Sequence, residues 1–232
     1  MIIQKKFYTA IGRLERKANS NGYSCPVIFL NGREYMVDIQ EMIIWSVLNW
    51  RIVTRTEIEV LYEKMVSDSG YFAARSCSDC IDRLLIRGLI TSGSGNSDYH
   101  ALYDLLAPLY IVPTTGTLPL RLLSFFKLTF YNRIPLAKTK QLFRKDRRTA
   151  NEQQIMQLSQ QALLSTAEII KCIEKGICYL TNDDSIMAYL YNDQETTSDN
   201  ISHLVKGSPN SKVVIQAIAN LYLRQQIIFE RI

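Results

Sequence analysis

The 232-residue sequence predicts a mainly α fold of the α+β class, with two similar modules that contain small β-hairpins and are joined by a helical basic segment. The first observation is a repeat: CIDRLLIRGLI at residues 80–90 is similar to AIANLYLRQQI at residues 217–227. Both copies have the pattern of a helix that runs into a strand. The identical aligned pairs are Ile81 and Ile218, Leu84 and Leu221, Arg87 and Arg224, and Ile90 and Ile227.

The second observation is that the flanks of the two copies also match. At a spacing of 143 residues, Ile43 lies opposite Ile186, and TRTEI at 54–58 lies opposite TSDNI at 197–201. In both copies, polar residues that suit a helix start lead into an isoleucine. The order helix, cap, helix, turn, helix and strand therefore occurs twice, although apolar helices also resemble one another by chance.

Composition gives the broad class. Hydrophobic residues make up 47% of the chain and charged residues 21%, which is typical of a soluble globular protein. Charges interrupt residues 1–17 too often for a signal peptide, and no apolar run approaches the roughly 18 residues of a membrane span. We therefore expect a cytoplasmic protein with no membrane contact.

Cysteine usage points away from covalent or metal chemistry. The chain has five cysteines, and an odd number argues against a disulfide framework in a cytoplasmic protein. Cys77 and Cys80 form a lone C-x-x-C, whereas structural zinc usually takes four ligands. The favoured interpretation is two small residues on a helix, and the alternative is a redox pair or half of a metal site.

Taken in order, the chain begins with a predicted N-terminal helix within residues 1–23. Phe7, Ile11 and Leu14 recur at helical spacing and would share one face. Asn31-Gly32 then separates two apolar runs, 27–30 and 33–37, and predicts a β-hairpin, because both turn residues tolerate positive φ.

Three helices and two short strands are expected next. A helix is predicted at 40–50, and Thr54-Arg-Thr-Glu57 is a capping box that starts the second helix. The third helix is expected at 72–87, ended near Gly88. Residues 89–91 would form a strand, 92–98 a flexible tip, and 99–103 the returning strand.

This order resembles a winged helix-turn-helix domain over about residues 24–104, and its recurrence resembles a tandem arrangement. In that family the third helix usually enters the major groove and the wing touches the DNA backbone. The resemblance places Arg75, Ser76, Ser78, Asp79 and Arg83 on or near the DNA-facing helix. Asp79, Asp82 and a loop without Lys or Arg argue against phosphate binding by this module alone.

Residues 105–180 are predicted as a connector with helices. The apolar stretch 122–131 favours a core or inter-domain helix over a partner-binding one. Residues 105–155 carry nine basic and two acidic side chains, a net charge of +7, whereas residues 1–104 are neutral. The basic residues of the densest stretch, KTKQLFRKDRR at 138–148, are Lys138, Lys140, Arg144, Lys145, Arg147 and Arg148. Such a stretch indicates a phosphate-contacting surface or, as the alternative, a solvated basic face.

Two further capping boxes, Thr149 to Glu152 and Ser165 to Glu168, predict helices near 150–164 and 166–176. The second module, at 181–232, would be truncated: its third helix covers 211–226, and the chain ends in a strand without a full wing. The possible nucleic-acid contacts at the start of that helix are Asn210, Ser211, Lys212 and Gln216. The alternative is a packing module that touches no nucleic acid.

The motifs of common enzyme classes are absent from the sequence, which has no G-x-x-x-x-G-K-[ST], H-E-x-x-H or G-x-S-x-G. We therefore expect no catalysis, cofactor or metal, and a DNA-binding protein that acts as a transcriptional regulator on double-stranded DNA. A homodimer through the N-terminal helix or the 120–131 helix is a further prediction. The alternatives are a protein-interaction scaffold and a plasmid-type replication initiator, which also carries two winged helices.

Overall fold

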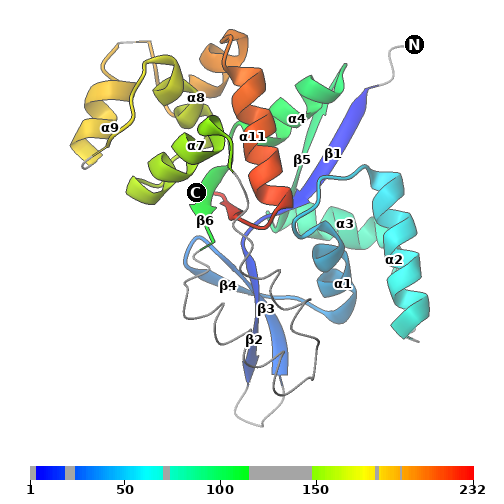
Figure 1. Cartoon of the computed structure of the whole chain (residues 1–232). Coiled ribbons are helices and arrows are strands. Elements are labelled where there is room, and N and C mark those ends of the chain that lie inside the picture. Colours follow the sequence, from blue (N-terminus) through cyan, green and yellow to red (C-terminus); the bar gives the residue numbers. More distant parts are fainter. Residues whose placement is uncertain (1–3, 19–23, 70–73, 115–147, 181–182, 194) are drawn as a thin grey trace, which may run out of the picture.

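The computed structural model describes residues 4–18, 24–69, 74–114, 148–180, 183–193 and 195–232. It is an α+β fold with three small antiparallel sheets, whose strand orders are β1-β5, β2-β3-β4 and β6-β7 (Figure 1). In chain order the elements are β1 (Lys5–Ala10), β2 (Arg13–Ala18), β3 (Ser24–Leu30), β4 (Arg33–Met36), α1 (Ile39–Leu48), α2 (Arg55–Ser69), α3 (Cys77–Ile86), β5 (Ile90–Gly95), α4 (Asp98–Leu106), β6 (Tyr110–Pro113), α7 (Ala150–Gln161), α8 (Thr166–Glu174), α9 (Asp183–Leu190), α10 (Ile201–Leu204), the 3-10 helix η3 (Val205–Gly207), α11 (Ser211–Leu223) and β7 (Ile227–Glu230).

The predicted N-terminal helix is wrong, because residues 5–10 and 13–18 are strands. β1 pairs with β5 from Lys5 opposite Gly95 to Ala10 opposite Ile90, and β2 pairs with β3. Local spacing cannot reveal a partner strand that lies 80 residues away in the chain. The predicted dimerisation through an N-terminal helix is therefore wrong as well.

The hairpin at Asn31-Gly32 is confirmed. β3 and β4 pair from Val27 opposite Met36 to Leu30 opposite Arg33, and the two turn residues have φ of 47° and 69°. These are the left-handed values that a tight two-residue hairpin turn requires. Together with β2 they form an arm that projects from the body of the molecule (Figure 1).

The predicted wing is also wrong. Residues 92–95 belong to β5, and residues 99–103 lie in helix α4 instead of a returning strand. The glycines of SGSG have a packing role: a Cβ at Gly93 would lie 2.1 Å from the backbone nitrogen of Leu105. These glycines allow α4 to pack directly on the β5 backbone. In the sequence, the same glycines led to the prediction of a flexible tip at residues 92–98.

The predicted helix starts are largely confirmed. The boxes at Thr149 and Ser165 close in both directions: the backbone N–H of Glu152 donates to Thr149, that of Glu168 donates to Ser165, and each glutamate reaches back. The Thr54 box forms as well, with the Thr54 N–H donating to Glu57 Oε2 over 2.7 Å. The third helix begins later than expected, after its N-cap Ser76, and ends before Gly88, which has φ of 69°.

The structure contains the same β–α–α–α–β unit twice, in a different alignment from the predicted one. The first unit is β1, α1, α2, α3 and β5, with β2, β3 and β4 inserted between β1 and α1. The second unit is β6, α7, α8, α11 and β7, with α9, α10 and η3 inserted between α8 and α11, so that α11 is its third helix by correspondence with α3. Each unit is closed by antiparallel pairing of its two strands. A single bridge joins each first strand to the start of its second helix, Tyr8 to Val53 and Tyr110 to Ser165.

The capping boxes give the register of the two units. Asp38 and Thr149, Glu41 and Glu152, Thr54 and Ser165, and Glu57 and Glu168 are each 111 residues apart. In this register α7 is the counterpart of α1, whereas the sequence repeat had placed residues 183–190 there. The predicted alignment of the third helices stands, because α3 and α11 occupy equivalent places.

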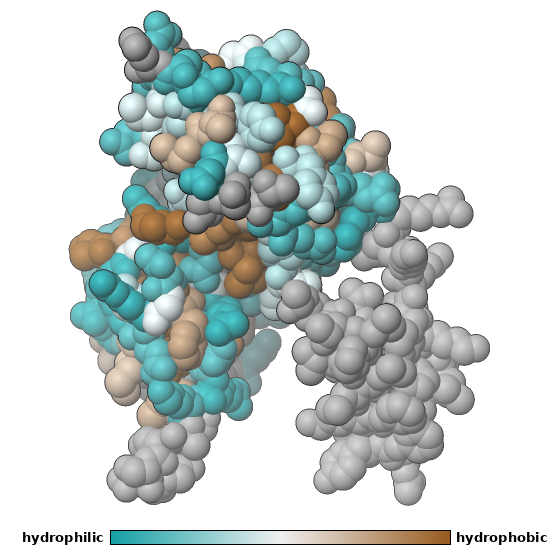
Figure 2. Space-filling model, turned by 90° about the vertical axis from the view of Figure 1, so that its left-hand side faces the viewer, coloured by the Kyte–Doolittle hydropathy of each residue, from teal (hydrophilic) through white to brown (hydrophobic). Residues whose placement is uncertain are grey.

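One continuous core joins both units. Tyr222 of α11 lies among residues of the first unit: its hydroxyl accepts hydrogen bonds from Thr9 Oγ1 and from the Trp50 backbone N–H, each over 2.9 Å. Helix α4 contacts both units, so the predicted boundary after residue 104 falls inside a helix. Apolar residues also remain at the surface between an upper and a lower lobe (Figure 2).

Within the described ranges, no helix is long and apolar enough to cross a membrane.

Candidate nucleic-acid interface

The predicted DNA-facing residues of the first unit are engaged within the protein. Arg75 pairs with Asp38, the N-cap of α1, and Ser76 accepts the N–H of Asp79 as the N-cap of α3. Ser78 accepts a hydrogen bond from Arg55 over 2.5 Å. Partial burial acts to raise the pKa of Asp38, but the backbone N–H of Glu41, the pairing with Arg75 and the backbone N–H of Gln40 together hold it below its usual value. These side chains organise helix starts.

Arg83 also forms an ion pair within the protein. Its Nε donates to Oε1 of Glu41 over 3.0 Å, while Arg87 binds the other carboxylate oxygen over 2.7 Å. The Glu41 side chain is only 2% exposed, so the two guanidinium groups compensate a buried charge. If Arg83 or Arg87 turned away to bind a phosphate, the buried Glu41 carboxylate would lose one of its two ion-pair partners.

The outer face of α3 carries acidic and apolar side chains beside Arg83, whose side chain is 53% exposed and paired with Glu41. Asp79 and Asp82 are exposed, and Ile86 is 86% exposed. Carboxylates repel a phosphate backbone, and an isoleucine offers it no hydrogen bond.

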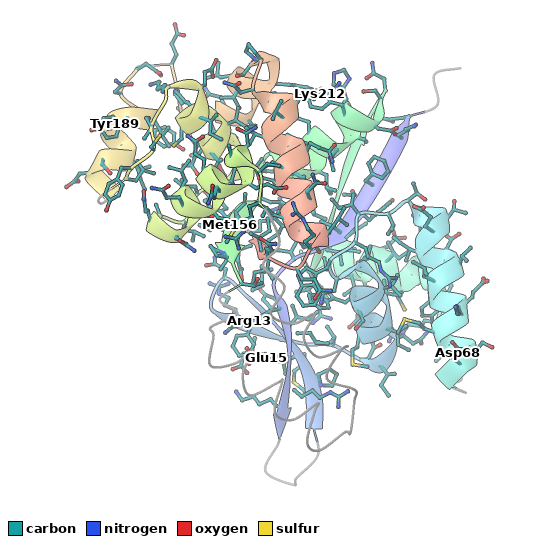
Figure 3. All side chains as sticks on the ribbon, in the orientation of Figure 1. Arg13, Glu15, Asp68, Met156, Tyr189 and Lys212 are labelled. Atoms are coloured by element: carbon teal, nitrogen blue, oxygen red, sulfur yellow. The ribbon has the colours of Figure 1, made fainter. Side chains whose placement is uncertain are left out.

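The third helix of the second unit presents a different face. Its exposed or half-buried outward positions are Lys212, Val213, Gln216, Asn220 and Leu223. Among residues 211–223 there is no Asp or Glu. The opposite face, which includes Val214, Ile218 and Leu221, is buried in the core, so α11 is held rigidly against α4, α7 and α8. Figure 3 shows Lys212 at the end of α11 that is distant from β7.

The basic stretch is seen only at its end. Lys138, Lys140, Arg144, Lys145 and Arg147 lie outside the described residues, whereas Arg148 is exposed and its Nε donates to Oε1 of Gln226 over 2.6 Å. Thr114, before the segment, donates its N–H to the Gln226 carbonyl over 2.9 Å. The chain therefore leaves and re-enters the described structure beside the residue that joins α11 to β7.

The arm is a second source of surface cations, three of which fall in the segment that was predicted as an N-terminal helix. β2 and β4 carry exposed Arg13, Arg16, Lys17 and Arg33. Arg13 pairs with Glu15 over 3.0 Å, and Lys17 pairs with Glu34 over 2.8 Å (Arg13 and Glu15 are labelled in Figure 3).

The cysteine pair has an environment that suppresses reactivity. Burial, with smaller contributions from nearby Glu59 and Cys80, raises the pKa of Cys77 to about 11. The pKa of the buried Cys80 thiol is also raised, mainly by desolvation. The thiolate is the nucleophile and the metal ligand, so these residues are poorly suited to redox or metal chemistry. Across the described part of the chain, no three His, Cys, Asp or Glu side chains converge as a metal site would need.

Comparisons with protein-family models, with curated proteins and with solved structures give no match.

Proposed function

We propose that this protein is a non-enzymatic DNA-binding protein, a transcriptional regulator built on two three-helix units similar to those of winged helix-turn-helix proteins, with α4 in the place of the expected wing of the first unit. The exposed face of α11 carries the proposal. It combines a cation with two side-chain amides, has no carboxylate, and belongs to the third helix of its unit. In winged helix-turn-helix proteins the third helix is the element that enters the major groove.

Backbone contacts would come from the basic stretch that ends at Arg148. Arg148 donates a hydrogen bond to Gln226, which follows α11 by three residues, so the last residue of the stretch lies beside the C-terminal end of the proposed reading helix. Cations that neutralise phosphates release counterions, which makes the affinity depend strongly on salt. Phosphate contacts of this kind would set the position and orientation of α11 on the duplex.

The test is a salt titration of binding to a mixed-sequence duplex, followed by fluorescence anisotropy. We expect the affinity to fall steeply with salt. Charge reversal at Lys145, Arg147 and Arg148 should weaken binding to all sequences and reduce the slope of log K against log salt by about 0.9 for each lost phosphate contact. A Lys64→Glu variant on the exposed surface of α2 is the control and should keep most of the affinity.

Absence of binding even at low salt, or an affinity that ignores both salt and the charge reversal, would rule out the DNA proposal. The second candidate is an assembly module, which the outer face of α3 favours because Ile86, at the end of the helix, is 86% exposed. An Ile86→Asp variant that loses a protein partner but keeps DNA binding would support protein interaction by the first unit and DNA binding by the second.

A further inference from the structure

We infer that α11 selects A·T base pairs, with the Gln216 and Asn220 amides bound to adenine in the major groove. The inference rests on the proposed DNA binding and adds to it the base that is recognised. Gln216 and Asn220 lie one helical turn apart, and Gln216 Nε2 donates to Asn220 Oδ1 over 3.2 Å.

That contact leaves a defined set of hydrogen-bonding groups. Gln216 keeps its Oε1 as an acceptor, and Asn220 keeps its Nδ2 as a donor. Adenine presents an N7 acceptor and an N6 amino donor in the major groove, which is the complementary pair. The Gln216–Asn220 contact orders both amides before DNA binds, which lowers the entropy cost of recognition.

Guanine fits this helix less well, because it presents two acceptors, N7 and O6, and is usually read by arginine or lysine. Arg224, near the end of α11, is held by buried Glu152 and by the carbonyl of Asn220. Lys212 is the cation of the outward face, and it lies at the first turn. Val213, which is 50% exposed beside Lys212, offers methyl groups to the C5-methyl of thymine.

The equivalent positions of α3 show that this face is particular to the second unit. In the register of the third helices, Asp79 corresponds to Gln216, Arg83 to Asn220 and Arg75 to Lys212. Asp79 has no donor for adenine N7, and the two arginines are paired with Glu41 and Asp38. Base selection is therefore assigned to α11 alone.

The experiment begins with selection of bound duplexes from a random library by the full chain. Each selected A·T pair is then replaced by G·C and by I·C, which matches G·C in the major groove and A·T in the minor groove. Anisotropy should show a loss of about tenfold or more for both replacements at the pairs that α11 reads. Gln216→Ala and Asn220→Ala should abolish that discrimination and leave binding to a G·C-only duplex within about twofold.

Gln157→Ala is the matched control, an exposed glutamine on α7, and should behave as the wild type. Circular dichroism checks the fold of Asn220→Ala, which is half-buried, while the exposed Gln216→Ala tests the inference independently. If the chain binds DNA without preferring A·T, if I·C binds as well as A·T, or if both amide variants keep the preference, the inference is overturned and DNA binding stands. If the wild type binds no duplex, the proposed function itself fails.

Discussion

At the scale of single residues, two buried glutamates hold equivalent places in the two units. Glu41 closes the capping box of α1 and binds Arg87, while Glu152 closes that of α7 and binds Arg224. Both glutamate side chains are 2% exposed. Each one fixes the end of a third helix to the start of a first helix, and this explains why Arg87 and Arg224 match in the sequence repeat.

We expect Glu41→Gln and Glu152→Gln each to lower the free energy of unfolding by about 2 kcal/mol or more, because each removes the carboxylate that compensates a guanidinium group. Urea denaturation followed by circular dichroism measures the change. The control is Glu15→Gln, which breaks the exposed pair with Arg13 and should cost less than about 1 kcal/mol. Equal effects in all three variants would contradict a special role for the buried pairs.

At the scale of elements, helix α4 and strand β5 illustrate a contact that depends on missing side chains. Gly93 and Gly95 face the backbone of α4, where an added Cβ would lie 2.1 Å from Leu105 N and 2.5 Å from Ala101 N. Since α4 also contacts α11, this packing links the first unit to the proposed reading helix. A displacement of α4 should therefore affect both units.

Gly93→Ala is expected to destabilise the protein by about 3 kcal/mol or more, because two backbone segments would have to move apart. Thermal denaturation at fixed concentration measures the effect. Gly207→Ala is the matched control: no atom lies within 4 Å of the Cβ position, and this glycine does not have positive φ. A Gly93→Ala protein with wild-type stability would show that α4 does not pack as closely as described.

At the scale of the whole molecule, Tyr222 joins the two units. Its ring stacks on Phe229, with centroids 4.4 Å apart. Its hydroxyl accepts hydrogen bonds from Thr9 and Trp50 of the first unit. Burial raises the pKa of Tyr222 to about 12, so the phenol is protonated and can also donate a hydrogen bond at neutral pH. The shared core implies that both units unfold together.

The sequence has two tryptophans, Trp45 and Trp50, and both lie in the first unit, so their fluorescence reports on that unit while far-UV circular dichroism reports on every helix. We expect the two probes to give coincident urea transitions. Tyr222→Phe should keep them coincident but lower the free energy of unfolding by about 1–3 kcal/mol, because buried donors lose their acceptor. Separate transitions in the wild type would show that the units fold independently.

Local signals in the sequence predicted local structure well. The helix starts at Thr54, Thr149 and Ser165 and the turn at Asn31-Gly32 were found because a cap or a tight turn depends on residues within four positions of each other. The helical periodicity of residues 7–14 was misleading, because Phe7 lies in β1, Leu14 lies in β2, and Ile11 lies in the connection between these strands.

The candidate site was predicted only in part. Lys212 and Gln216 were identified from their place at the start of a helix, and the structure shows both exposed. The amide of Asn220 was missed, although the four-residue spacing from Gln216 was visible in the sequence. The ion pairs of Arg75 with Asp38 and of Arg83 with Glu41 could not be predicted from the sequence, because each pair joins residues about 40 positions apart.

By itself, the sequence of this protein determined where most helices begin, that its third helices form a repeat, and where its positive charge concentrates. These features depend on short-range hydrogen bonding, helical periodicity and composition. The tertiary structure decided that β1 pairs with β5, that α4 replaces a wing, and that α7 is the counterpart of α1. It also decided which third helix keeps its polar side chains free, because burial and ion pairing depend on residues that only folding brings together.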